Sequence, residues 1–445
     1  MILPPEAASL LEVFAPLFTQ PTFHRFVTLL AGVLLTPGRR TVANVLRTLG
    51  LLAPGHPASY RRVLSAARGS GVELGGVLAG FLLKHFVPDG PVALVGDDTV
   101  DGHPGRHVYG KARHRDPVRS SHSYTAWRYG HKWVVLAVLV RFPGTTRPWA
   151  LPILVDLYRT AEDDRRRERT HRTPARLMCR LLRLVLLRFP DRRFTFVGDA
   201  GYGTHEVARF CHRHRDRLAL VNKLHPDANL FTPPPPYTGK GRPRVKGDRL
   251  PKPREAVAGA KRLRRLTVGW YGGDVRRVGT KSGLGHWYKA GQGLVPIRWV
   301  FVRDLTGTHR DEYFFTTDPA RTPTGVIEPY CGRWNIETTF QECRSCLGSE
   351  STRGWCQATV LRAAPCLFGL YSVVAALYHL LPEDKRVGRV DWPGKAGVTF
   401  SDAVTTVRRR FWDEGVFSQA FDEAGVKKLT LPLREFLLNR LAMAA

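Results

Sequence analysis

Acidic side chains stand at three places in this sequence where a metal-dependent reaction could be carried out. "LVGDDTV" puts Asp97 and Asp98 at the end of a predicted strand, and "FVGDAGYG" puts Asp199 at the end of another. Carboxylates at the strand ends of an α/β sheet lie where ligands usually bind. Each aspartate alone could instead cap a turn, because Asp favours turns. With a glutamate further along, Glu337, they indicate a site for Mg2+, which prefers hard oxygen ligands.

The glutamate belongs to the run "YCGRWNIETTFQECR" at 330–344, which predicts one helix. At about 100° per residue, four polar side chains fall in one narrow stripe beside an apolar face: Tyr330, Arg333, Glu337 and Arg344. An amphipathic helix with a salt bridge at its rim would explain this run alone. Two strand-end aspartates elsewhere favour the metal site, in which shared carboxylates hold two ions about 3.5–4 Å apart.

The composition points to a polyanionic partner. Among 445 residues, 68 Lys and Arg oppose 38 Asp and Glu, which gives a formal net charge of +30. Nucleic acid is the commonest partner of such a chain. No run of 18 uninterrupted apolar residues indicates a membrane span, and the seven cysteines, an odd number, suit a reducing cytosol. We therefore expect a cytoplasmic protein with no membrane partner.

The positioning elements fall into five regions. From about residue 91 the order strand, strand, strand, helix, strand, helix, strand predicts a mixed α/β sheet. The Pro- and Gly-rich stretch that follows breaks this pattern and predicts an inserted, mainly-β unit. The predicted regions are a helical DNA-binding region at 1–88, the first part of the catalytic core at 89–222, the mainly-β insertion with a basic loop at 223–318, the rest of the core with the Glu337 helix at 319–381, and a C-terminal helical region at 382–445.

Two features leave alternatives open. The helices around "TPGRR" in the first region could form a helix-turn-helix or part of a plain helical bundle. The basic loop carries "GRPR", with Arg242 and Arg244, which is similar to an AT-hook core that enters a narrow minor groove. A solvated loop that contacts only phosphates explains the same residues.

The order Asp98, Asp199, Glu337 resembles the DDE triad of cut-and-paste transposases with a ribonuclease H-like fold. Tyr330, Arg333 and Glu337 match the spacing of the YREK signature, Tyr-x2-Arg-x3-Glu-x6-Lys, of one bacterial insertion-sequence subgroup. Arg344 stands where that signature has Lys, so the charge is kept while the geometry of a phosphate contact changes. Matching "GDDT" to the family's acidic-Asp-Thr run selects Asp98 as the metal ligand, with Asp97 as the alternative.

The resemblance implies an α/β, ribonuclease H-like catalytic core with the mainly-β insertion, flanked by helical regions. It implies a transposase that binds the terminal inverted repeats of its insertion sequence as a dimer on DNA. Two Mg2+ (or Mn2+) ions would support cleavage at the ends and joining of the 3′ ends to target DNA, in the bacterial nucleoid.

Each site residue also takes a role from the resemblance. Tyr330, Arg333 and Arg344 would grip phosphates, and Trp334 and Trp287 would stack on a flipped base. A core role for Trp287 explains that residue equally well. The rival functions are a ribonuclease H-like nuclease without strand transfer, a domesticated sequence-specific DNA-binding protein, and an RNA-binding structural protein, which would leave the acidic residues unexplained.

Overall fold

The computed structural model of the chain describes residues 3–116, 119–239, 241–388, 391–414 and 430–443. Lys240 of the predicted basic loop and residues 415–429 of the predicted C-terminal region lie outside these residues.

One mixed sheet organises the chain. Its strands are β1 (Val92–Gly102), β2 (Ala112–Arg115), β3 (Trp127–Val140), β4 (Trp149–Tyr158), β5 (Phe194–Gly198), β6 (Leu218–Lys223), β7 (Leu230–Phe231), β8 (Arg264–Gly269), β9 (Val275–Lys289), β10 (Gly293–Asp304) and β11 (Glu312–Thr316). The order across its 11 strands is β2-β3-β1-β5-β6-β11-β10-β9-β7, with β4 beside β3 and β8 beside β9. Strands β1, β5 and β6 run parallel, and the other pairs are antiparallel.

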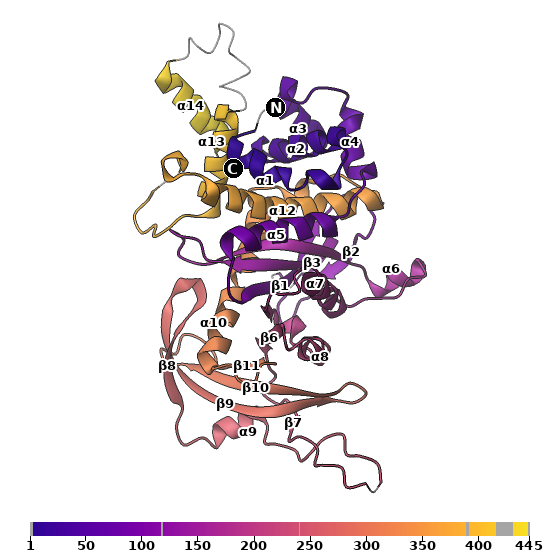
Figure 1. Cartoon of the computed structure of the whole chain (residues 1–445), viewed down its shortest axis with the longest axis vertical. Helices are drawn as coiled ribbons and strands as arrows, with labels where there is room; N and C mark the ends of the chain where they lie inside the picture. Colours follow the sequence, from indigo (N-terminus) through magenta and orange to yellow (C-terminus); the bar gives the residue numbers. More distant parts are fainter. Residues whose placement is uncertain (1–2, 117–118, 240, 389–390, 415–429, 444–445) are drawn as a thin grey trace.

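The helices are α1 (Pro5–Glu12), α2 (Gln20–Leu35), α3 (Val42–Leu49), α4 (Pro57–Ala66), α5 (Gly71–Phe86), α6 (Ala161–Arg166), α7 (Pro174–Arg188), α8 (His205–Arg213), α9 (Pro253–Ala258), α10 (Pro323–Arg333), α11 (Asn335–Ser345), α12 (Gln357–Leu380), α13 (Phe400–Trp412) and α14 (Leu431–Ala442). Helices α1 to α4 form a bundle at one end of the molecule, the strands β7 to β10 lie at the other, and α12 runs between the bundle and the sheet (Figure 1).

Most elements lie where the sequence predicts them. The predicted strands of the core appear as β1, β3, β4, β5 and β6, and the predicted helices between them as α7 and α8. The β-rich stretch 223–318 also contains strands, but these continue the same sheet because β11 pairs with β6. The division into five regions remains a prediction.

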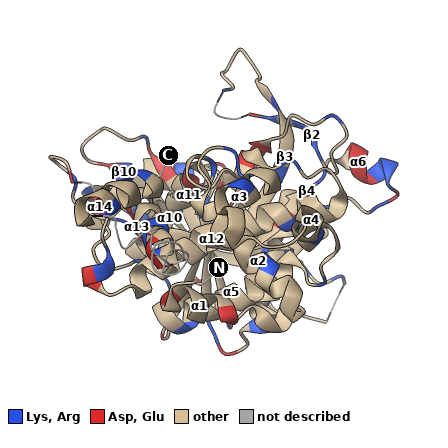
Figure 2. Ribbon diagram, turned by 90° about the horizontal axis from the view of Figure 1, so that it is seen from above, with Lys and Arg blue, Asp and Glu red and all other residues tan. Residues whose placement is uncertain are grey.

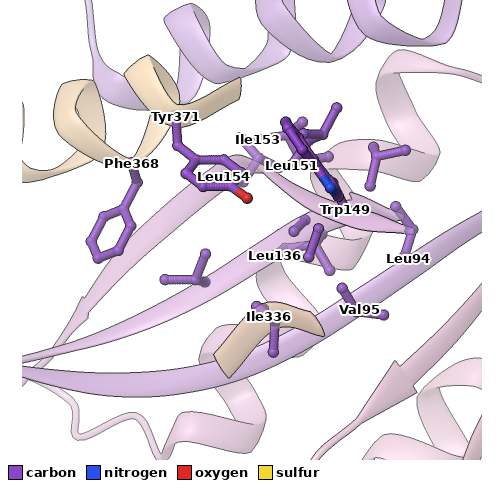
Figure 3. Packing of buried hydrophobic residues seen from close by; sticks show 14 of the residues in the cluster. Leu94, Val95, Leu136, Trp149, Leu151, Ile153, Leu154, Ile336, Phe368 and Tyr371 are labelled. Carbon is purple, nitrogen blue, oxygen red and sulfur yellow. The ribbon is translucent and has the colours of Figure 1, made fainter. Parts of the chain in front are cut away.

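Apolar strand faces and helices share one core. The apolar stretches 92–95 of β1, 133–140 of β3 and 149–154 of β4 are almost continuously buried, as expected where both faces of a sheet are covered. Figure 3 shows Leu94, Leu136 and Leu154 of these strands in the same cluster as Ile336 of α11 and Phe368 of α12. The core therefore fixes the helix that carries Glu337 against the strand that carries the aspartates.

Helix α12 is long and apolar enough to cross a membrane, by length and composition alone. The sequence-based search for an uninterrupted apolar run did not single it out. In the structure, 67% of its most apolar window is buried inside the fold. It packs against β4, α5 and α13, and Arg362 donates to the backbone oxygens of Leu64 and Ala67 beside α4. It is the central core helix.

The close contact between α5 and β4 yields a prediction. A Cβ at Gly75 would lie 2.0 Å from the carbonyl oxygen of Ile153, whereas at Gly80 of the same helix the nearest atom would be 3.9 Å away. We expect Gly75→Ala to destabilise the fold by about 1–3 kcal/mol through overpacking. Gly80→Ala should be neutral or stabilise it by up to about 1 kcal/mol, because Ala favours helix. Urea unfolding of both variants would test this, and equal effects would contradict it.

Candidate active site

The two adjacent aspartates of β1 face opposite sides of the sheet, because side chains alternate along a strand. Asp97 faces α10, where its Oδ2 lies 2.8 Å from Nη1 of Arg333. Asp98 faces the other side, where its Oδ1 lies 2.8 Å from Nζ of Lys132. The hydroxyl of Tyr202 also donates to Asp98, over 3.4 Å. The two carboxylates therefore belong to different polar groups.

Asp199 follows β5 directly and lies level with Asp97. The parallel register pairs Gly96 with Gly198, so the next residue of each strand is one of the two aspartates. The backbone N–H of Asp199 donates to the carbonyl of Gly96. Asn222 of β6 donates to the backbone oxygen of Asp199 over 3.2 Å. Backbone pairing thus places Asp199 beside β1 independently of any ligand.

Glu337 comes from a helix that differs from the prediction. The predicted single helix over 330–344 is two helices, α10 and α11, which meet at Trp334. Arg333 is the last residue of α10 and Glu337 lies in the first turn of α11. Their side chains still meet across four residues, with Nη2 of Arg333 3.0 Å from Oε1 of Glu337. The break between α10 and α11 therefore leaves the contact between Arg333 and Glu337 intact.

The guanidinium of Arg333 joins the three carboxylates into what we call the acidic trio: Asp97, Asp199 and Glu337. Besides the contacts to Asp97 and Glu337, its Nη2 lies 3.7 Å from Oδ1 of Asp199. The Arg333 side chain is almost completely buried. The structure thus brings Asp199 and Glu337 together as predicted, but with Asp97 rather than Asp98.

Burial dominates the electrostatics of the trio. It raises the pKa of the Asp97 carboxyl to about 8, although the charge of Arg333 opposes the shift. Burial also raises the pKa of Glu337, again against the effect of Arg333. For Arg333 itself, burial lowers the pKa, but the carboxylates, led by Asp97, hold it above its ordinary value. One guanidinium therefore does not fully offset the cost of burying these acids.

This donor set fits a divalent cation chemically. Carboxylate oxygens are the ligands that Mg2+ prefers, and three of them converge here on one positive charge. Among the described residues, no group of three or more His, Cys, Asp or Glu side chains is already arranged around a metal position. Arg333 accounts for this, because its guanidinium lies among the carboxylates that would hold an ion.

The other residues of the signature differ in how accessible they are. Tyr330 is buried, with its ring 4.5 Å from that of Phe314 and its hydroxyl pKa raised by burial. Arg344 is partly exposed, donates to Thr99 over 2.9 Å, and lies near the buried Asp101. Trp334, at the junction of the helices, is 51% exposed. In this structure Trp334 and Arg344 can be reached from outside, and Tyr330 cannot.

The predicted DNA contacts of the β-rich stretch differ in how exposed they are. Arg242 and Arg244 are exposed, and Arg244 pairs with Asp248 of the same loop over 3.2 Å. Trp287 packs edge-on against Phe315 with ring centroids 5.5 Å apart, and its backbone oxygen contacts His205. The core alternative for Trp287 therefore fits its surroundings in this structure.

Sequence reasoning missed Lys132 and Tyr202, the two partners of Asp98. Lys132 begins an apolar run and Tyr202 follows Asp199 in "FVGDAGYG", but no local pattern relates either residue to Asp98. The opposite orientations of Asp97 and Asp98 could have been read from strand alternation, which places Asp97, Thr99 and the odd-numbered residues on one face.

Two aspartate-bearing strands and a glutamate-bearing helix thus meet around the guanidinium of Arg333. The sequence matches the family described as DDE superfamily endonuclease over residues 13–277, more than half of the chain. The chain belongs to this family, whose members typically use divalent metals. The match includes Asp97, Asp98 and Asp199 and ends before Glu337.

Two further comparisons add little detail. A search of curated proteins finds no match. Among solved structures, a piggyBac transposase synaptic complex with hairpin DNA is similar at 12% identity, covering 95% of this chain and 76% of that chain. The TM-score of 0.41 means that the two folds superpose only loosely.

The burial of Arg333 yields a prediction. Arg333→Met removes the cation and leaves the carboxylates, so we expect a loss of about 3–5 kcal/mol at pH 8, the scale for breaking a buried ion pair. Millimolar Ca2+ should raise the melting temperature of this variant more than that of the unaltered protein. Arg344→Met, which removes a partly exposed Arg of the neighbouring helix α11, should cost less and show no extra Ca2+ effect. Equal Ca2+ responses in both variants would contradict the assignment.

Proposed function

We propose that the protein is a cut-and-paste DNA transposase that cleaves the ends of its own element and joins the 3′ ends to target DNA. The convergence of Asp97, Asp199 and Glu337 on one point carries this proposal. Membership of the DDE superfamily endonucleases supports the nuclease step. The net charge of +30 supports DNA as the partner.

In this proposal Asp97, Asp199 and Glu337 would hold the divalent ions, two Mg2+ or Mn2+. Such ions, when bound, activate water and stabilise the leaving oxygen of a phosphodiester. Asp98, the ligand that the motif selects, instead pairs with Lys132, which neutralises it on the other face of the sheet. Its role is then to hold β1 and β3 in place through that ion pair.

We assign the DNA contacts of the site to Arg333, Trp334 and Arg344. Arg344 lies in the same helix as Glu337, and Trp334 follows Arg333 directly; both are accessible, so they suit a phosphate contact and a base contact. Arg333 lies close enough to the carboxylates to meet the scissile phosphate once the acids hold other cations. Guanidinium groups suit this role because they pair with phosphate through two parallel hydrogen bonds.

The finer identity follows the sequence resemblance. We assign the protein to the bacterial insertion-sequence transposases of the YREK subgroup, with Arg344 in the lysine position. The antiparallel β4-β3-β1 unit followed by parallel β5 and β6 supports a ribonuclease H-like core. Binding of two terminal inverted repeats implies a dimer on DNA. We place the reaction in the bacterial cytoplasm.

A nuclease that cuts without joining is the second candidate, because the acidic trio supports both reactions. Incubating the protein with pre-cut element ends, supercoiled plasmid and Mg2+ separates the two. Joined products indicate a transposase. Cleavage of uncut ends without any joining would leave the nuclease, and DNA binding without cleavage would indicate a domesticated DNA-binding protein.

The two adjacent aspartates give a direct test of the trio. We expect Asp97→Asn, Asp199→Asn and Glu337→Gln each to slow cleavage by roughly a thousandfold or more, the scale for losing a transition-state charge contact. Asp98→Asn keeps the trio and should slow cleavage by no more than about tenfold, or 1.4 kcal/mol. Single-turnover cleavage of an end-containing duplex measures this. The reverse order for Asp97 and Asp98 would restore the assignment made from the motif.

The exposed arginines of the basic loop predict a salt effect. Each phosphate neutralised contributes about −0.9 to the slope of log K against log salt on duplex DNA. We expect Arg242→Ala with Arg244→Ala to make that slope shallower by one to two such increments. Fluorescence anisotropy across a salt series measures it, and an unchanged slope would show that the loop does not touch the duplex.

A further inference from the structure

The strands β2 and β3 extend beyond the site as a two-stranded ribbon with one exposed face. Register pairs Arg113 with Tyr129 and Arg115 with Trp127, so these four side chains share that face. Trp127 is 49% exposed and Tyr129 60% exposed. The opposite face is anchored, because His114 is buried there with its ring 6.0 Å from that of Tyr158.

Cations already stack on the exposed aromatics. The Arg113 guanidinium lies over the Trp127 ring, 4.3 Å from its centroid, and Lys111 lies 6.0 Å from the centroid of Tyr129. Residues 104–130 carry six Lys or Arg and one acid, Asp116. Figure 2 shows Lys and Arg on both strands of the ribbon. Exposed rings among positive charges are the combination that binds single-stranded nucleic acid, since bases stack on rings and phosphates pair with cations.

The distance between the ribbon and the acidic trio follows from the register along β3. Asp97 pairs with Val135 of β3, eight residues along the strand from Trp127. At about 3.3 Å per residue this is roughly 26 Å, and a strand of duplex DNA covers it in about eight nucleotides. The ribbon lies beyond Gly102, the last residue of β1, which pairs with Gly130.

We propose that the exposed face of the β2–β3 ribbon binds unpaired bases of the DNA strand that leads away from the cleavage site. Trp127 and Tyr129 stack on bases, and Arg113 and Arg115 pair with the adjacent phosphates. This rests on the proposed function for the identity of the strand as DNA. A duplex offers this face only phosphates, because its bases are already stacked, so the aromatics contribute only where bases are unpaired.

Binding of tailed and blunt duplexes tests the proposal. Fluorescence anisotropy at one fixed salt concentration would compare a blunt duplex with duplexes that carry a thymidine tail of about ten nucleotides on the 3′ or the 5′ strand, within the usual site size. We expect one tail to tighten binding by the unaltered protein. Trp127→Ala with Tyr129→Ala should weaken binding of that duplex by about tenfold or more and leave blunt-duplex binding unchanged.

A matched control separates stacking from general loss of exposed rings. Trp392 is 54% exposed and has Lys395 4.3 Å from its centroid, but it lies in the segment between α12 and α13. Trp392→Ala should leave tailed-duplex binding unchanged, and Trp127→Phe with Tyr129→Phe should retain most of it. Thermal melting verifies that each variant is folded.

Three outcomes would overturn the proposal: no tail effect in the unaltered protein, an equal loss on tailed and blunt duplexes, or a loss as large in the Trp392 variant. Cleavage of a blunt, end-containing duplex is measured on the same preparations. If the unaltered protein binds tails but does not cleave, the transposase proposal fails and the ribbon assignment stands.

Discussion

The charge of Arg333 among three carboxylates is the constraint on which the arrangement of β1, β5, α10 and α11 depends. Asp97, Asp199 and Glu337 come from two strands and a helix, and the charge of Arg333 lowers the cost of burying their carboxylates together. The buried guanidinium holds them at 2.8–3.7 Å. It also gives the end of α10 a fixed position over β1 and β5. The geometry of the acidic trio is therefore established by the fold itself.

The same arrangement explains why the two faces of β1 serve different purposes. On one face, Asp97, Thr99 and Asp101 meet Arg333 and Arg344, so this face collects charge that substrate or ions can compete for. On the other, Asp98 is satisfied by Lys132 and Tyr202. The contacts on both faces hold the same strand, β1. Replacing a residue on one face therefore also affects the position of the residues on the other face. Effects of substitutions on the two faces are thus not expected to be additive.

Much of this arrangement could be predicted from the sequence, and the part that could not has a physical reason. The buried strands can be predicted because each of β1, β3 and β4 contains an apolar run. The sequence singled out Asp199 and Glu337 as candidates because they end a strand and lie on a helical stripe. The choice of Asp98 came from matching a motif, which carries no information on which face a side chain points to. The break at Trp334 and the burial of Tyr330 depend on packing against β11 and β5, and no local pattern encodes such long-range contacts. The exposed rings of the ribbon were also missed, because exposure of Trp127 is a tertiary property.

The position of α12 has a consequence for how the protein can be made. Residues 357–380 lie between the bundle formed by residues 5–66 and β4, and Arg362 donates hydrogen bonds to the backbone oxygens of Leu64 and Ala67. During translation the N-terminal helices therefore emerge long before the segment that completes their core. They must remain unfinished, or be protected by chaperones, while roughly 300 further residues are added, which takes about 15–60 s at 5–20 residues per second. A copy of the gene truncated before this helix would yield a chain whose N-terminal helices lack the helix against which they pack.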